Sequence, residues 1–405
     1  MITIKAFDKG LKCRDFKYEV GKTYELPTEK VKMCEYGFHA SAHCDISETI
    51  EYYPFVTENE YALVDIHVID KTYDKVVGDK ITILRKLETL DELISYDKTG
   101  MWCYEYAKNT KDIDIIKQLQ NAIIEKDETG EYCCYFAESV RDANIRKLEN
   151  AIIQKDKTGE WCYYLARWVN DTSTEKLQEA VIQKDKTGMF CFYFSRYVKG
   201  ADTKKLQEAI IQKDRTGQWC TEFAYYIPGA DTQKLESVVI ERDPNGENCC
   251  IFAESFENAN IEKLQEAVIQ KDKTGIFCER FAHYVQDADI PRLEKAVIEK
   301  DRTGEWCTWF AREVKGANIE KLQEAVIQKD NTGEWCMKFA SWVKGADIRK
   351  LQEEVIRKDQ TGQWCLEFAK YVEGANLEVL RDAIYKKNTY GSLRDKVDEL
   401  VGKGG

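Results

Sequence analysis

Cysteine and histidine side chains gather near the start of the chain, at Cys34, His39, His43 and Cys44. Thiolate and imidazole groups bind zinc, so this cluster is a candidate metal site. Its spacing, C-x4-H-x3-H-C, differs from that of zinc fingers and zinc knuckles. We therefore expect His39 to be a structural residue at the end of a strand, and we predict no metal and no cofactor.

The same region contains a strand pattern, YGFHAS (36–41), followed by ISETIEYY (46–53) and EYALVDIHV (60–68). This order resembles the middle of ADP-ribosyltransferase domains, where a tyrosine at the end of a helix stacks on nicotinamide. The resemblance implies this role for Tyr52 or Tyr53, and it makes His39 a further candidate catalytic residue. Such enzymes also need a histidine or arginine in the first strand and a catalytic glutamate in a later one. This sequence shows no clear counterpart of either.

Ten more cysteines recur at one position of a repeated unit. The copies open at Asp97, Asp127, Asp156, Asp185, Asp214, Asp243, Asp272, Asp301, Asp330 and Asp359. The first interval is thirty residues and the other eight are twenty-nine. Packed helices lie about 10 Å apart, which is farther than a disulfide can bridge. We interpret these cysteines as small buried side chains of a protein in a reducing compartment.

Each copy predicts two helices joined by a turn, as DKTGMFCFYFSRYVKGADTKKLQEAIIQK (185–213) illustrates. Counted from the opening Asp as zero, apolar residues at five, six, nine, ten and thirteen form one face of a first helix. The opening Asp is predicted to cap this helix, and an Asp, Asn or Ser at seventeen to cap the second. Apolar residues at twenty-one and twenty-four to twenty-six form the buried face of the second helix.

Ten such pairs predict an all-α solenoid, because neither helix can bury its apolar face without the neighbouring copy. We assign residues 97–388 to ten two-helix repeats. Residues 87–96 are predicted to form a half-repeat or linker, and residues 389–405 a capping helix and tail.

Residues 1–86 do not follow the repeat. Short β-branched and aromatic runs such as ITIKAF (2–7), KTYEL (22–26) and KITIL (80–84) predict strands. One short helix is expected at 46–53, before Pro54. The fold class is therefore a small α+β N-terminal domain followed by the α-solenoid.

Positions seven, eight, eleven and twelve of the first helix lie off its apolar face, and many of them are aromatic. In copies two to five these residues are Tyr135, Tyr163, Tyr164, Trp168, Phe192, Tyr193, Tyr197, Tyr225 and Tyr226. Aromatic side chains clustered on a rigid surface are typical of binding sites. We predict a partner-binding surface; the alternatives are a wide core between copies and a platform for stacking nucleobases.

Four stretches, KAFDKGLKCRDFKYEVGKTYE (5–25), CEYGFHAS (34–41), EYYP (51–54) and VDIHV (64–68), resemble a domain of unknown function common in phage and prophage proteins. The repeats, as in FAREVKGANIEKLQEAVIQKD (310–330), are similar to unnamed helical repeats of phage and bacterial proteins. These resemblances imply an architecture and a phage-type origin, but no activity.

The net charge is −12, and ten of these charges lie outside residues 1–86. This acidity opposes nucleic-acid binding, which needs a basic stripe for the phosphates. No apolar run is long enough to span a bilayer, and MITIKAFDKG is not a signal peptide, so we expect a cytoplasmic protein without membrane contact.

The predicted function is that of a non-catalytic, phage-type accessory protein whose solenoid surface binds a macromolecule. The expected partner is a host protein, such as a defence factor, in the host cell cytoplasm. One alternative is a nucleotide-handling enzyme of the ADP-ribosyltransferase type with the solenoid as a targeting arm. Another is an acidic mimic of DNA.

Overall fold

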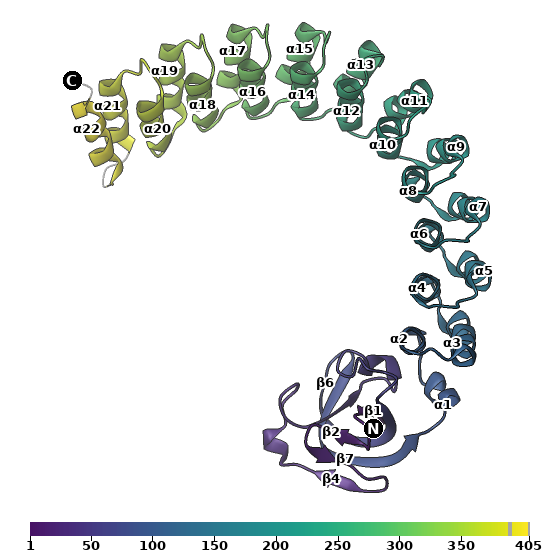
Figure 1. The fold of residues 1–405 in the computed structure, drawn as a ribbon. Helices are drawn as coiled ribbons and strands as arrows, with labels where there is room; N and C mark the ends of the chain where they lie inside the picture. The colour runs from purple at the N-terminus through teal and green to yellow at the C-terminus, as the bar shows by residue number, and fades with distance from the viewer. Residues whose placement is uncertain (388–390, 404–405) are drawn as a thin grey trace. The chain divides into compact units, whose positions relative to one another are not determined.

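The computed structural model describes residues 1–387 and 391–403. Residue 388 at the predicted end of the solenoid, and residues 389–390 and 404–405 of the predicted capping helix and tail, lie outside the described residues. The chain divides into two compact units, Met1–Ala209 and Ile210–Gly405. The first unit contains a small sheet domain and the early repeats, and the second contains the later repeats (Figure 1). The predicted fold class, a small sheet domain followed by an α-solenoid of paired helices, is confirmed.

The small domain is built on one antiparallel sheet with the strand order β1, β6, β7, β4, in which β5 also pairs with β7. Its strands are β1 (Ile2–Phe7), β4 (Thr23–Glu25), β5 (Phe38–Ser41), β6 (Glu60–Lys71) and β7 (Lys75–Leu87). Two further short strands, β2 (Lys12–Cys13) and β3 (Phe16–Lys17), form a separate hairpin. Apolar side chains of the sheet form one buried cluster together with Leu11 and Tyr18, which precede and follow the hairpin in the sequence.

The helix predicted over 46–53 is wrong in length. The structure has a 3₁₀ helix, η2 (Ile46–Thr49), capped by the side chain of Asp45, and a second short one, η1 (Thr28–Lys30). Pro54 disfavours helical backbone at the residue before it, so the segment closes as a single turn. The half-repeat is a short helix, α1 (Leu90–Ser95), with a capping box between Thr89 and Glu92.

The repeats form alternating first and second helices. The first helices are α2 (Met101–Asn109), α4 (Glu131–Ser139), α6 (Glu160–Trp168), α8 (Met189–Tyr197), α10 (Gln218–Tyr226), α12 (Glu247–Ser255), α14 (Ile276–Tyr284), α16 (Glu305–Glu313), α18 (Glu334–Trp342) and α20 (Gln363–Tyr371). The second helices are α3 (Ile113–Lys126), α5 (Ile145–Lys155), α7 (Thr174–Lys184), α9 (Thr203–Lys213), α11 (Thr232–Arg242), α13 (Ile261–Lys271), α15 (Ile290–Lys300), α17 (Ile319–Lys329), α19 (Ile348–Lys358) and α21 (Leu377–Lys387). Within a unit, each first helix packs on the next first helix, as α4, α6 and α8 show in Figure 1. The helix α22 (Leu393–Lys403) follows the last pair and buries Val397.

We predicted that the opening Asp of each copy is the N-cap residue of the first helix, and this is wrong. The Asp lies three residues before the N-cap residue and caps the first turn from there. In α18 the N-cap residue is Gly333, whose φ of +88° turns the chain. Because glycine has no side-chain acceptor, Gly333 itself cannot cap the N–H groups of the first turn. The carboxylate of Asp330 supplies the missing acceptor: one oxygen accepts from the N–H groups of Thr332 and Gly333, and the other from that of Cys336. The predicted cap at position seventeen is confirmed, for example at Asn318, which accepts from the N–H of Lys321 at 3.1 Å.

Two polar contacts recur along the repeats, one between neighbouring copies and one within a copy. Gln323 in α17 accepts a hydrogen bond at 2.8 Å from the N–H of Asp347, which caps α19 in the next copy. Lys329 donates at 2.5 Å to the main-chain carbonyl of Asp301, which opens its own copy. The first contact recurs at Asn144–Gln120, Ser173–Glu149, Asp202–Gln178, Asn260–Glu236, Asp289–Gln265, Asn318–Glu294 and Asn376–Gln352.

The ten repeat cysteines are buried and unbridged, which confirms their interpretation as small core side chains. Burial raises the pKa of Cys365 to about 12, so this thiol stays protonated and unreactive at neutral pH. In the part of the chain that the structure describes, no helix is both long and apolar enough to cross a membrane.

Candidate functional site

A cavity of about 1120 Å³ opens in the small domain. Its walls come from β1, the β2–β3 hairpin, β4, β5 and the segment that follows η2. The cavity brings together His39, Tyr52 and Tyr53, the three candidate catalytic residues, and also Cys34 from the proposed metal cluster. Their convergence on one hollow makes this the candidate site for a small molecule.

Both ring nitrogens of His39 are occupied by main-chain groups. Nδ1 lies 3.1 Å from the carbonyl oxygen of Gly37, and Nε2 accepts a hydrogen bond from the N–H of Cys34. Burial, together with the nearby Lys5 ammonium, lowers the pKa of His39. The imidazole is therefore held neutral, with its proton on Nδ1, and its two bonds stabilise the loop before β5. His39 lies near the start of β5 and not at the end of a strand as we expected.

The four residues of the proposed metal cluster do not converge. His43 lies on the surface with Nδ1 2.5 Å from a carboxylate oxygen of Glu48, whereas His39 points to its own loop. Cys34 is exposed and Cys44 is half-buried. Within residues 1–387 and 391–403, no group of three or more His, Cys, Asp and Glu side chains is arranged to hold a metal ion.

The two tyrosines of the cavity differ in their surroundings. Tyr53 is half-buried and its hydroxyl donates to the sulfur of Cys13, 3.1 Å away. Tyr52 is exposed at the cavity edge, where its hydroxyl contacts Asp74 and accepts from the ammonium of Lys75. The Lys75 ammonium also lies 4.2 Å from the centre of the Tyr52 ring. Tyr52 is thus the ring that a ligand can reach.

Lys5 is a cavity residue that the sequence analysis missed. It lies in the middle of β1, is 5% exposed, and donates a hydrogen bond at 2.8 Å to the carbonyl oxygen of His39 in β5. Burial lowers the pKa of Lys5, and Arg14 lowers it further. A sequence signal was available, because Lys5 shares a strand face with Phe7, a residue of the domain core.

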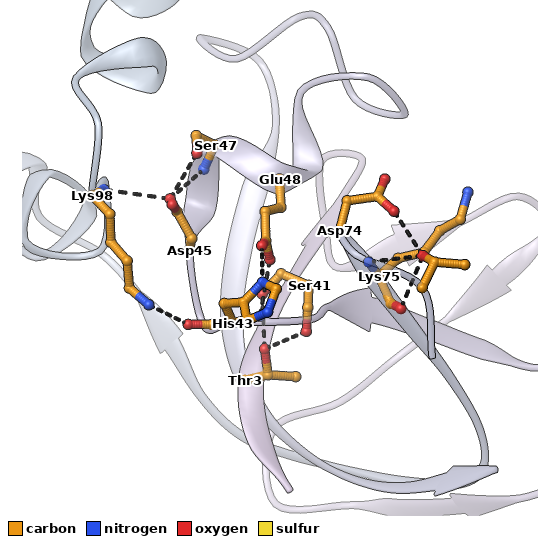
Figure 2. A network of polar contacts seen from close by, with 10 residues as sticks. Thr3, Ser41, His43, Asp45, Ser47, Glu48, Asp74, Lys75 and Lys98 are labelled. Atoms are coloured by element: carbon orange, nitrogen blue, oxygen red, sulfur yellow. Dashed lines mark hydrogen bonds and ion pairs between the residues drawn. The ribbon is translucent and has the colours of Figure 1, made fainter. Parts of the chain in front are cut away.

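A polar network fixes the cavity wall against the first repeat (Figure 2). The hydroxyl of Thr3 donates to the carbonyl of Ser41 at 2.7 Å, which holds β1 against β5. Lys98, in the loop before α2, donates at 2.6 Å to the carbonyl of His43, and its N–H points to the carboxylate of Asp45. The chain from Ser41 to Asp45 therefore forms hydrogen bonds both to strand β1 and to the first repeat.

The predicted aromatic surface of the first helices is divided by burial. Trp168, Tyr197, Tyr225 and Tyr226 are exposed, and Tyr135, Tyr164 and Tyr193 are half-buried. Tyr163 and Phe192 are buried, at 3% and 2% exposure, and so lie in the packing between copies. Position seven is thus largely core, while positions eight, eleven and twelve carry the accessible rings.

Arg167 is a second residue that the sequence analysis did not single out. Its guanidinium lies 4.4 Å from the ring of Trp168 in α6 and 4.4 Å from the ring of Tyr197 in α8. It also donates a hydrogen bond to the hydroxyl of Tyr163 at 2.6 Å. In the second unit, Arg312 lies in the same way between Trp309 and Trp342. An arginine between aromatic rings of successive copies therefore occurs in both units.

Among the comparisons with known proteins, the family match concerns the small domain and the short helix that follows it. Residues 1–95 match the model of a family described as "Domain of unknown function (DUF7666)", which confirms the expected resemblance to an uncharacterised domain. No curated protein matches the chain. One solved structure, described as "Computational Design of Self-Assembling Cyclic Protein Homooligomers", is 14% identical and covers 75% of this chain and 91% of its own, with a TM-score of 0.10. That score supports no argument about fold or assembly.

Proposed function

We propose that the protein is a binding protein whose repeats recognise a protein partner through the first helices. The observation that supports this most directly is the cluster of Arg167, Trp168 and Tyr197. Trp168 is 53% exposed, although it is large and apolar, and the two rings hold the arginine in place between two copies. Tryptophan, tyrosine and arginine are the residues that most often carry the free energy of protein–protein binding.

The charge of this cluster suggests the chemistry of the partner. Within the described residues, no carboxylate lies at ion-pair distance from the Arg167 guanidinium. An acidic side chain of the partner can therefore form a charge-assisted bond with it, while an apolar side chain packs on the rings. We base the proposal of a host protein, such as a defence factor, on the sequence resemblance of the small domain to phage and prophage proteins and of the repeats to phage and bacterial proteins.

Capture from host lysate tests the proposal. The full-length chain is compared with a variant in which Tyr164, Trp168, Tyr193 and Tyr197 are all serine, and with Tyr73→Ser as a control at an exposed ring of the small domain. We expect the fourfold variant to lose the partner with only a small fall in melting temperature, and the control to keep it. A large fall in the melting temperature would show that the rings are core. Capture of the same partner by a chain ending near residue 86 would contradict the proposal.

A second candidate function, an enzyme acting in the small-domain cavity, is favoured by the convergence of His39, Tyr52 and Tyr53 there. Two features of the family that the sequence resembles have no clear counterpart. β1 offers Lys5 in place of a histidine or arginine, and the glutamates that line the cavity, Glu25, Glu35 and Glu48, do not lie in the later strands β6 and β7. If this candidate function is correct, the protein should transfer labelled ADP-ribose from NAD to lysate proteins, and the Tyr52→Ala variant should not.

A further inference from the structure

The cavity of the small domain has more cationic than anionic groups available to a ligand. Four carboxylates line it, and three of them are already engaged: Glu25 by Lys80, Glu35 by Lys32 and Glu48 by His43. The lining cations are Lys5, Arg14 and Lys75. Within the described residues, none of these three forms an ion pair with a carboxylate. The unbalanced charge in the cavity is therefore positive.

Lys5 is unusual because its ammonium group is buried and has no carboxylate partner among the described residues. A buried ammonium without a counter-ion is costly, so buried lysines normally pair with an acid or become neutral. Here the ammonium donates to a single main-chain carbonyl, which leaves two of its three donors for another acceptor. It borders a cavity rather than close-packed core. An anion in the cavity would supply both the missing charge and the missing acceptors.

Aromatic rings form much of the remaining wall. Phe16, Tyr36, Tyr52 and Phe55 line the cavity and are all more than 40% exposed. Behind them Tyr18 and Tyr24 pack edge-on against Phe16, which makes that side rigid. Exposed rings beside a cavity offer stacking platforms for a planar group, and stacking on a base stabilises its complex substantially. The cavity thus combines an anion anchor with surfaces for a ring.

We propose that this cavity binds a nucleoside phosphate, with the phosphate on Lys5 and Arg14 and the base against the aromatic wall. Its volume of about 1120 Å³ is slightly above the range of about 300–1,000 Å³ that is typical of small-molecule sites, so a ligand of this size has room to bind. The inference concerns binding alone. It holds with or without a reaction in the cavity, and it does not depend on the partner of the repeats.

Calorimetry on the full-length chain with inorganic phosphate, adenosine, AMP and ADP tests it. We expect ADP to bind at least about tenfold more tightly than phosphate or adenosine, because only ADP engages both parts of the site. Lys5→Met should weaken ADP binding at least about tenfold through loss of a charge-assisted hydrogen bond. The control Lys9→Met removes an exposed lysine outside the cavity and should bind as the wild type does.

The ring contacts are tested by a double substitution, Tyr36→Ser with Phe55→Ser, which should weaken ADP binding and leave phosphate binding unchanged. Melting curves accompany each titration. Lys5→Met should melt at the wild-type temperature or higher, since it replaces a buried unpaired charge by an apolar chain of similar size. Arg14→Met, at an exposed cation of the wall, provides a variant that keeps the fold in any case. Absence of ADP binding to the wild type, or unchanged ADP affinity in both Lys5→Met and Arg14→Met, would overturn the proposal.

Discussion

The carboxylate of Asp330 accepts a hydrogen bond from the backbone N–H of Cys336, 2.9 Å away, so that one side chain spans the whole loop before α18. The other carboxylate oxygen accepts from the N–H groups of Thr332 and Gly333 at 2.8 and 3.0 Å. The N–H of Asp330 itself continues the preceding helix α17 by donating to Val326. The same carboxylate contact to a cysteine N–H is present in all ten copies.

Removing this carboxylate should destabilise the second unit. In Asp330→Ala three N–H groups, two of them buried, lose their acceptor, and we expect the free energy of unfolding to fall by about 3 kcal/mol. Chemical denaturation followed by circular dichroism measures the change. Glu353→Ala removes an exposed acid from α19 and serves as the matched control. Equal stability of the two variants would contradict the role given to Asp330.

Two glycines with the same backbone separate conformational strain from steric contact. Gly217 and Gly229 have φ of +79° and +78°, and a Cβ at Gly217 would lie 3.2 Å from the Cα of Val239, whereas one at Gly229 would meet nothing within 4 Å. Gly229→Ala should therefore cost about 1 kcal/mol, which is the penalty of the left-handed conformation alone. Gly217→Ala should cost at least about 1 kcal/mol more, because α11 must shift. Equal losses in thermal denaturation would show that the loop and α11 separate without strain.

The stability of the second unit should depend on pH through Glu279. Burial in α14, with the neighbouring Glu313 carboxylate, raises the pKa of Glu279 to about 7. Because the folded state then binds the proton more tightly than the unfolded state, this residue favours folding at low pH, and its contribution is lost as the pH rises from about 4.5 to about 7. The total effect is at most about 3 kcal/mol.

The variant Glu279→Gln removes this titration. We expect it to be more stable than the wild type at pH 8, and the difference to shrink as the pH approaches 5, in denaturation experiments at each pH. Arg280 and His283 lie beside Glu279 and are kept unchanged. A stability difference that is constant with pH would mean that Glu279 titrates normally.

Arg167→Met should affect partner capture more than folding. Each cation–ring contact at an exposed site contributes about 0.5–1 kcal/mol, so the loss of free energy of unfolding should stay near 1–2 kcal/mol. Partner capture should fall at least about tenfold, because the exposed guanidinium is lost from the surface. Lys199→Met, at an exposed lysine in the turn after α8, is the control and should leave capture unchanged.

The periodic features of the fold could be read from the sequence because they are local. The two helices per copy, the caps such as Asn318 and the buried cysteines all follow from residue type and spacing. We placed the start of the first helix at the opening Asp because Asp is a frequent N-cap residue. The left-handed turn at Gly333, where the helix begins, could not be predicted from the spacing of apolar residues.

The candidate site was less predictable because its residues meet through non-local packing. Lys5 is charged, and an isolated charge in a strand usually faces water; only the passage of β5 beside β1 buries it under His39. His39, Tyr52 and Tyr53 were singled out from a resemblance, and the structure does place them at one cavity. Arg167 was missed because the ring of Tyr197, which completes its surroundings, belongs to the next copy.

The bonds of Gln323 to Asp347 and of Lys329 to Asp301 bear on how such a chain changes over evolutionary time. Neither bond reaches beyond the adjacent copy, so deletion of a whole internal copy rejoins ends that present the same donors and acceptors. Gene duplication and unequal recombination can therefore lengthen or shorten the array by multiples of twenty-nine residues without new compensating mutations. A single-residue insertion between Gln323 and Asp347 would instead move the N–H donor of Asp347 away from the Gln323 side-chain oxygen that accepts from it, and selection should remove it.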